Sequence, residues 1–215
     1  MNGRTRIKIC GVRDAETARV CASSGADAVG LMFVESSPRA VDPDRALEVM
    51  GALPVFTTAV GVVADLDVDA FCDLEAACPA PVFQLHGRED EKTVRACGPG
   101  LIKAFRFDAA TIGSQLARWG GIDEVDAVLI DGSSGGAGTS FDWGALAAAL
   151  DDFPKRVIVA GGLHAGNVGE AIRTVRPFAV DVSSGVESAP GVKDHDKIRA
   201  FCEAVRAADA ALASS

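Results

Sequence analysis

Short apolar segments recur along the chain, and each is followed by a longer stretch in which apolar residues return at helical spacing. The short segments are rich in β-branched residues and are bounded by loop-forming residues, so they predict strands. The longer stretches predict amphipathic helices. The expected strands are eight, at residues 6–10, 27–33, 58–63, 81–86, 101–107, 127–131, 156–161 and 179–183.

Residues that begin helices accompany the helical spacing. Asp14 and Asp42 precede such stretches, where a short carboxylate can accept hydrogen bonds from the first-turn N–H groups. Either Asp65 or Asp67, and also Asn167, are expected to act in the same way. The clearest predicted helices are residues 14–24, 42–52, 68–77, 168–175 and, as the longest, 194–211.

Strands that alternate with helices favour a parallel sheet with right-handed crossovers. Eight such units without a linker favour closure into an α/β barrel of eight parallel strands, the (βα)8 or TIM barrel, with short loops. An open, doubly wound sheet is the alternative, but such sheets more often stop at about five or six strands. We expect residues 1–215 to form a single barrel domain.

Composition and charge exclude some classes of function. Hydrophobic residues make up 48% of the chain and charged residues 24%, as in ordinary globular domains. A net charge of -9 argues against nucleic-acid binding, which requires a basic surface. No apolar run approaches the roughly 20 residues that cross a bilayer, and the first residues lack the apolar stretch of a signal peptide. We therefore expect a cytoplasmic protein without a membrane or nucleic-acid partner.

The six cysteines predict neither a metal site nor disulfides. None lies in a C-x-x-C pair and histidines are scarce, which argues against zinc. Thiols in the cytoplasm are kept reduced, which argues against disulfides. Cys21, Cys72 and Cys202 lie in helical stretches, and we expect them to pack as small core residues.

Polar side chains gather where several predicted strands end. In a barrel of this kind the chemistry takes place at the carboxyl ends of the strands, and alternate side chains point inward. Burying polar groups costs free energy unless they are paired or used, so their convergence predicts an active site. The inward polar residues are Lys8, Cys10, Gln84, His86, Asp131, Asp181 and Ser183.

Each of these residues has a structural alternative. Lys8 and Asp181 could form a buried ion pair that only stabilises the barrel. His86 could be a hydrogen-bonded core residue, and Gln84 could bind backbone groups. Asp131 fits such an explanation least, because it ends an apolar strand and precedes a glycine-rich loop.

Two turns and one arginine are suited to anions. The turns at residues 161–163 and 183–185 follow strands seven and eight, whose loops often bind phosphate in this fold, and glycine lets the backbone approach it. Two ordinary tight turns are the alternative. Arg39, in the loop after strand two, could hold a carboxylate through two parallel hydrogen bonds, although a lone loop arginine is more often solvated. On strand five, Lys103 and Arg106 lie on opposite faces, and the pattern leaves open which one points inward.

Several motifs together resemble the phosphoribosylanthranilate isomerase family, from about residue 8 to residue 201. The strand-one motif Lys8-Ile9-Cys10-Gly11 and the strand-eight run of residues 176–187 are the most specific of them. The other matching motifs are Gly25-Ala26-Asp27-Ala28-Val29-Gly30, Ser37-Pro38-Arg39, Gln84-Leu85-His86-Gly87, Phe141-Asp142-Trp143, Gly161-Gly162-Leu163 and Lys193-Asp194-His195.

The resemblance implies an Amadori rearrangement in tryptophan biosynthesis, of N-(5-phosphoribosyl)anthranilate to 1-(o-carboxyphenylamino)-1-deoxyribulose 5-phosphate, with no cofactor and no metal. By position it implies that Asp131 is the general acid that protonates the ribose ring oxygen. Cys10 is implied as the general base that takes the C2′ proton, and Arg39 as the anchor of the anthranilate carboxylate. The implied phosphate-binding residues are Gly162, Ser183, Ser184 and Gly185.

Physical chemistry sets conditions on the two catalytic roles. A general base works best with a pKa near the operating pH, while a free cysteine titrates at about 8.5. We therefore expect Lys8, two residues away on the same face, to lower the pKa of Cys10. Asp131 must be protonated to act as an acid, so we expect its pKa to be raised. The residues expected to contact the substrate are Arg39, Lys8, Gln84, His86 and Asp181.

Two alternative functions remain. The histidine-pathway barrel isomerase, or its dual-substrate relative, performs the same rearrangement, but its strand one ends in Asp and a second phosphate site follows strands three and four. Here strand one ends in Cys10, and residues 64–67 are acidic. A non-catalytic phosphosugar-binding barrel would be free to lose Cys10 or Asp131, and both are present. The pattern does not distinguish a monomer from a homodimer.

Overall fold

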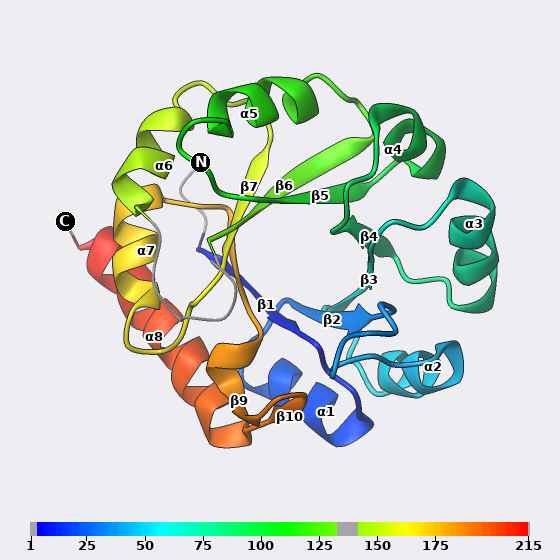
Figure 1. The fold of residues 1–215 in the computed structure, drawn as a ribbon. Helices are drawn as coiled ribbons and strands as arrows, with labels where there is room; N and C mark the ends of the chain where they lie inside the picture. Colours follow the sequence, from blue (N-terminus) through cyan, green and yellow to red (C-terminus); the bar gives the residue numbers. More distant parts are fainter. Residues whose placement is uncertain (1–3, 133–141, 215) are drawn as a thin grey trace.

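The computed structural model describes residues 4–132 and 142–214. Eight parallel strands close into a barrel in the order of the sequence, because β1 pairs with β8, and helices form a ring outside them (Figure 1). The predicted (βα)8 barrel is confirmed, and the open sheet is excluded. The barrel strands are β1 (Arg6–Cys10), β2 (Ala28–Met32), β3 (Thr58–Val63), β4 (Val82–Leu85), β5 (Leu101–Arg106), β6 (Val125–Asp131), β7 (Arg156–Ala160) and β8 (Ala179–Val182).

A helix follows each barrel strand, and shorter elements separate β8 from the last helix. The helices are α1 (Ala15–Ser23), α2 (Pro43–Gly51), α3 (Val68–Ala77), α4 (Glu91–Cys97), α5 (Ile112–Gly120), α6 (Trp143–Ala149), α7 (Val168–Val175) and α8 (His195–Ala213). The sequence pattern did not predict the 3-10 helix η1 (Ser184–Val186) or the hairpin of β9 (Glu187–Ala189) and β10 (Val192–Lys193).

Aspartates cap three of the four helices for which the sequence predicted a cap. The side chains of Asp14, Asp42 and Asp67 each accept a hydrogen bond from the backbone N–H three residues on, which satisfies a donor of the first turn. Asp67 rather than Asp65 is therefore the cap of α3. Asn167 precedes α7 but makes no such bond, because its side chain is bonded to the turn after β7 instead.

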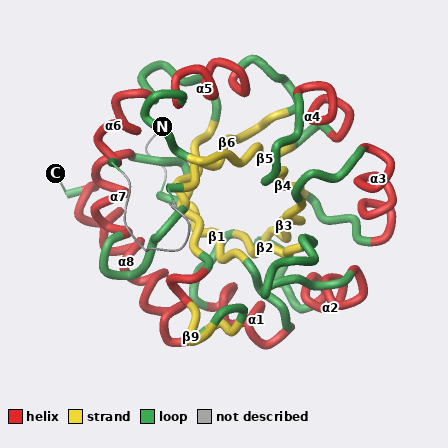
Figure 2. Tube along the Cα trace, in the orientation of Figure 1, coloured by secondary structure: helices red, strands yellow, loops and turns green. Residues whose placement is uncertain are grey.

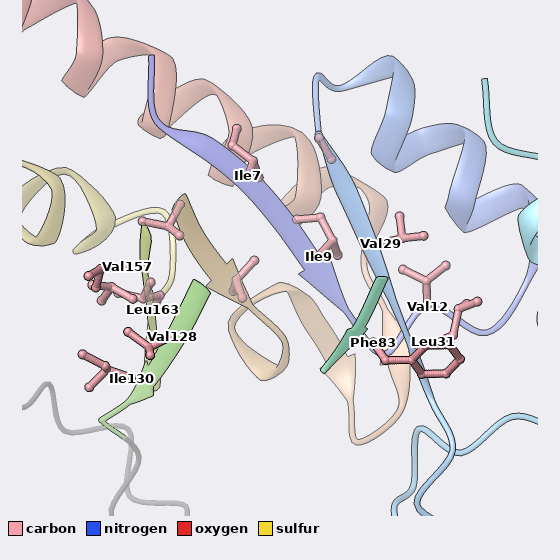
Figure 3. Close-up of a cluster of buried hydrophobic side chains, with 14 of the residues drawn as sticks. Ile7, Ile9, Val12, Val29, Leu31, Phe83, Val128, Ile130, Val157 and Leu163 are labelled. Atoms are coloured by element: carbon pink, nitrogen blue, oxygen red, sulfur yellow. The ribbon is translucent and has the colours of Figure 1, made fainter. Parts of the chain in front are cut away.

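Two apolar layers hold the barrel together, one inside it and one between the strands and the helices. The pleat of each strand sends successive side chains to opposite layers. Figure 3 shows Ile7 and Ile9 of β1, and Val128 and Ile130 of β6, in the outer layer, as their alternation predicts. The inner layer consists of Cys10, Val60, Val62, Ile102, Ala104, Ala127, Leu129, Ile158, Ala160 and Ala179.

One predicted core position is wrong. Cys21 and Cys202 are buried as expected, but Cys72 is exposed. The preceding residue, Phe71, is the one that α3 buries. Because neighbouring residues on a helix point about 100° apart, burial of Phe71 turns Cys72 away from the barrel.

Candidate active site

A buried ion pair between β1 and β8 lies in the barrel interior. The two strands pair with Lys8 opposite Asp181, and Lys8 Nζ donates a hydrogen bond to Asp181 Oδ1 at 2.8 Å. Their side chains are 4% and 9% exposed. Burial disfavours the ammonium charge, but Asp181 and, after it, Cys10 outweigh that effect and raise the pKa of Lys8. Lys8 therefore stays charged inside the barrel.

Cys10 is the last residue of β1, on the same face as Lys8. Its side chain is buried beside Gly30, where a Cβ would come within 2.8 Å of Cys10 Sγ. Burial and, to a smaller extent, the charge of Asp181 raise the pKa of the thiol, while Lys8 and, more weakly, Lys193 act to lower it. The effect expected of Lys8 has the predicted sign, but burial outweighs it and the pKa of Cys10 lies above its ordinary value.

A second polar group comes from β4 and β6. Gln84 Nε2 lies 2.8 Å from His86 Nδ1, just beyond the end of β4, and His86 Nε2 lies 3.7 Å from Asp131 Oδ2. Gln84 Oε1 is buried and has no hydrogen-bond partner among the described residues. The structure therefore brings these three predicted side chains together.

The residues implied as acid and base belong to strands on different sides of the barrel. Figure 2 shows β1 and β6 on facing sides of the barrel. Cys10 is the last residue of β1, and Asp131 is the last residue of β6. A general acid and a general base so placed can act on opposite sides of a small molecule between them.

The structure settles which cation of β5 points inward. Lys103 lies outside the barrel, where its Nζ donates to Glu89 Oε2 at 2.8 Å and to two carbonyl oxygens near the end of β4. Arg106 lies on the same face of β5 as Ile102 and Ala104, which belong to the inner layer. It is opposite Asp131 in the register of β5 and β6. Arg106 therefore lies at the rim of the barrel, and Lys103 holds the loop that follows β4.

A carboxylate without a predicted role, that of Glu187, holds the guanidinium of Arg39. Arg39 donates from Nε and Nη2 to the two oxygens of Glu187, at 2.7 and 2.8 Å. Lys193 of β10 donates to the same carboxylate at 2.9 Å. Glu187 and Lys193 both lie in motifs that resemble the phosphoribosylanthranilate isomerase family. The only other signal for them in the sequence is that they are charged residues between strand eight and the last helix.

The turns after β7 and β8 pack directly on each other. Gly162 has a φ of 66°, a left-handed value that favours glycine. At Gly185 a Cβ would collide with the carbonyl oxygen of Leu163, so a side chain there would push the turns apart. Ser183 Oγ donates to the carbonyl oxygen of Cys10 at 3.1 Å, which ties this region to β1. The residues implied in phosphate binding are thus adjacent: Gly162, Ser183, Ser184 and Gly185.

Residues 4–132 and 142–214 contain neither a candidate metal site nor a candidate membrane-spanning helix. No group of three His, Cys, Asp or Glu side chains there could hold a metal ion. No helix in that part of the chain has the length and apolar character needed to cross a membrane. The glycine-rich loop after β6 and Phe141 of the matching motif lie outside the described residues.

Comparisons with known proteins decide the family. A protein-family model described as N-(5′-phosphoribosyl)anthranilate isomerase matches residues 7–204. The chain belongs to the phosphoribosylanthranilate isomerase family. A curated isomerase of that name from Acidithiobacillus ferrooxidans is 45% identical, over 94% of this chain and 97% of the relative. Another, from Magnetococcus marinus, is 44% identical over 94% and 96%.

Solved structures of the phosphoribosylanthranilate isomerase family share the fold of this chain. The enzyme from Thermotoga maritima has a TM-score of 0.86 and 36% identity, covering 94% of this chain and 99% of that one. A family member in complex with reduced 1-(o-carboxyphenylamino)-1-deoxyribulose 5-phosphate has a TM-score of 0.83 and 35% identity, with the same coverage. The resemblance inferred from the motifs is therefore confirmed.

Proposed function

We propose that the chain catalyses the isomerisation of N-(5-phosphoribosyl)anthranilate to 1-(o-carboxyphenylamino)-1-deoxyribulose 5-phosphate, a step of tryptophan biosynthesis. Family membership supports the reaction. The structural observation that carries the proposal is the placement of Cys10 and Asp131 at the ends of facing strands. In the same barrel, the glycine-containing turns after β7 and β8 pack against each other.

The reaction divides into two proton transfers. Asp131 protonates the ring oxygen of the ribose, the C1′–O bond breaks, and the nitrogen lone pair forms a Schiff base. Cys10, as the thiolate, removes the proton at C2′, and the electron pair of that bond forms the enolamine. A proton returned to C1′, with loss of the proton of the C2′ hydroxyl, then converts the enol into the ketone of the product. The substrate neither gains nor loses electrons overall, so no cofactor is required.

The substrate carries an anion at each end, and the proposed contacts follow from that. The phosphate binds the backbone N–H groups and hydroxyls of the two joined turns, at Gly162, Ser183, Ser184 and Gly185. The anthranilate carboxylate binds Arg39. The sugar between them contacts Lys8, Gln84, His86 and Asp181, which lie on β1, β4 and β8 or just beyond.

The test is turnover by the wild type and two variants, with phosphoribosylanthranilate made in situ from anthranilate and its loss followed by fluorescence. Removing a general acid or base typically slows a reaction by about 10²–10⁴-fold, and we expect losses in this range for Cys10→Ala and Asp131→Asn. Wild-type activity no higher than the spontaneous breakdown of the substrate would contradict the proposal.

The same preparations test the two alternative functions. A non-catalytic phosphosugar-binding barrel would bind the reduced product analogue equally well in wild type and Cys10→Ser, and neither protein would turn over substrate. A histidine-pathway or dual-substrate isomerase would turn over the aminoaldose bis-phosphate of that pathway. We expect neither result, because β1 ends in a cysteine and Asp65 and Asp67 follow β3, where a second phosphate would bind.

Location and assembly complete the proposal. We infer a cytoplasmic enzyme that binds a small phosphosugar and no nucleic acid, consistent with its net charge of -9. A relative from Thermotoga maritima is described as dimeric. Both a monomer and a homodimer are compatible with the fold, and light scattering across a concentration series distinguishes them. Val55 and Phe56, 92% and 94% exposed, are the apolar side chains to substitute if a dimer is found.

A further inference from the structure

Glu187 lies between two cations that belong to different segments of the chain. It begins β9 after the barrel has closed, yet its carboxylate meets Arg39, from the loop after β2, and Lys193, from β10. The side chain of Glu187 is 4% exposed and that of Lys193 is 3% exposed. Burial acts to raise the pKa of Glu187, but the two cations outweigh it, and the pKa lies below its usual range. The carboxylate is therefore ionised at neutral pH.

The contacts use one edge of the Arg39 guanidinium and leave another edge unused. Glu187 accepts from Nε and Nη2, the side-on edge, at 2.7 and 2.8 Å. The end-on edge, formed by Nη1 and the second N–H of Nη2, has no hydrogen-bond partner among the described residues. A guanidinium whose side edge is fixed presents its end edge in a defined direction, and that edge matches the two oxygens of another carboxylate.

Lys193, the other cation, has no donor to spare. Its Nζ donates to the carbonyl oxygen and the hydroxyl of Ser183, at 3.0 and 3.4 Å, and to Glu187 Oε1 at 2.9 Å. An ammonium group has three N–H donors, so these contacts use all of them. Of the two cations on Glu187, Arg39 is thus the one that can accept a further anion.

Close packing fixes the segments that carry these residues. A Cβ at Gly11 would come within 2.6 Å of Arg39 Cδ, so the arginine lies directly over the end of β1. A Cβ at Gly191 would collide with the carbonyl oxygen of Pro38, so the β9–β10 hairpin rests on the loop that carries Arg39. The cluster is therefore built into the fold.

We propose that Glu187 is a positioning residue for substrate recognition: it fixes the guanidinium of Arg39 so that its free edge receives the carboxylate of the substrate, and it links that anchor through Lys193 to Ser183 at the phosphate end. Without the carboxylate charge, Arg39 and Lys193 repel each other and the guanidinium loses its fixed direction. This role rests on the proposed function, because it assigns Arg39 to the carboxylate of that substrate.

The test compares two ligands that differ only in the carboxylate. Reductive amination of ribose 5-phosphate with anthranilate gives the carboxylated analogue, and the same reaction with aniline gives the analogue without a carboxylate. Dissociation constants of both are measured by calorimetry for wild type, Glu187→Gln, Glu187→Asp, Arg39→Met, the double variant Arg39→Met/Glu187→Gln and the control Glu89→Gln. Circular dichroism first confirms that each variant is folded. Hydrogen bonds to charged groups suggest an effect of about tenfold to a hundredfold.

We expect Glu187→Gln to weaken binding of the carboxylated analogue by about tenfold to a hundredfold. Binding of the analogue without a carboxylate should weaken by less than about threefold. Glu187→Asp, which keeps the charge, should recover part of the loss. In the Arg39→Met background, Glu187→Gln should add little, because the residue acts through Arg39. Glu89→Gln is the matched control: its carboxylate is equally buried and paired with Lys103, but lies outside the barrel, so the ratio of the two constants should not change.

Three results would overturn the role of Glu187. They are equal weakening of both analogues by Glu187→Gln, no weakening of either, or an effect of Glu187→Gln that persists in full without Arg39. Failure of the proposed function gives a different result, since the wild type itself would then neither turn over phosphoribosylanthranilate nor prefer the carboxylated analogue.

Discussion

Replacing Lys8 with methionine tests how strongly the ion pair between β1 and β8 is linked to folding. Methionine approximates the length of the lysine stem but carries no charge, so Asp181 would remain buried without its cation. Lys8 Nζ is 2.8 Å from the carboxylate, and the side chain of Asp181 is only 9% exposed. Removing one partner of a buried pair typically lowers the free energy of unfolding by about 3–5 kcal/mol.

Protonation sets an upper limit on that loss. Asp181 can take up a proton instead of remaining charged, and protonating a carboxyl group of ordinary pKa about 3.9 at pH 7 costs about 4 kcal/mol. At pH 5 the same protonation costs only about 1.5 kcal/mol. A buried carboxylate without its cation is relieved by taking up a proton, so the loss of stability in the variant should be small at low pH and grow as the pH rises. We expect losses of about 3–4 kcal/mol at pH 7 and about 1.5 kcal/mol at pH 5.

Urea denaturation at both pH values, followed by the fluorescence of Trp119 and Trp143, measures these losses. The matched control is the double variant Lys8→Met/Asp181→Leu, which removes both charges and should recover most of the stability. The reasoning would be refuted by a loss that is the same at pH 5 and pH 7, or by a double variant no more stable than the single one.

The same substitution reports on the thiol of Cys10. Lys8 acts to lower the pKa of Cys10 against the effect of burial, so Lys8→Met should raise that pKa further. The rate of alkylation by iodoacetamide across pH gives the pKa, and mass spectrometry of the Cys10 peptide separates it from the exposed Cys72. An unchanged alkylation profile would show that Lys8 has no part in tuning the base.

Two further predictions concern packing and pH. Gly185→Ala places a methyl group against the carbonyl oxygen of Leu163. The KM for the phosphorylated substrate, measured by steady-state kinetics, should therefore rise at least tenfold, which corresponds to about 1.4 kcal/mol of binding free energy. Gly113→Ala is the control, because Gly113 has open space around it, and it should leave KM unchanged. Burial raises the pKa of Cys21 to about 12 and that of Cys202 to about 11. Unfolded thiols ionise at lower pH, so stability should fall between pH 8 and 10 by roughly 1–2 kcal/mol for each thiol, as measured by urea denaturation; a loss that Cys21→Ala leaves unchanged would argue against this cause.

The barrel could be predicted from the sequence because local rules build it. In β1 the apolar Ile7 and Ile9 alternate with Lys8 and Cys10, and the pleat of the strand turns this alternation into an outer and an inner face. Element boundaries followed the same rules less closely. The start of β6 at Val125 was missed because the exposed Asp126 interrupts the apolar run that marks the strand.

The contacts that tune the site follow no such rule. Arg39 and Glu187 are 148 residues apart and lie outside the barrel strands, so neither periodicity nor strand register connects them. The net pKa shift of Cys10 could not be predicted either. The sequence places Lys8 two positions away, but the burial that outweighs it depends on Gly30 of the neighbouring strand and on the inner apolar layer.

Recognition of the two ends of the substrate, in the proposed mode, depends on different parts of the fold. At the phosphate end, closure of β1 on β8 sets the contacts, since it places Lys8 opposite Asp181 and brings Ser183 to the carbonyl oxygen of Cys10. At the carboxylate end, the β9–β10 hairpin supplies Glu187 to Arg39. Changes that weaken the closure of the barrel should therefore reduce stability and phosphate binding together. Changes in the hairpin should act on carboxylate recognition while the barrel stays folded, because the hairpin lies outside the closed sheet.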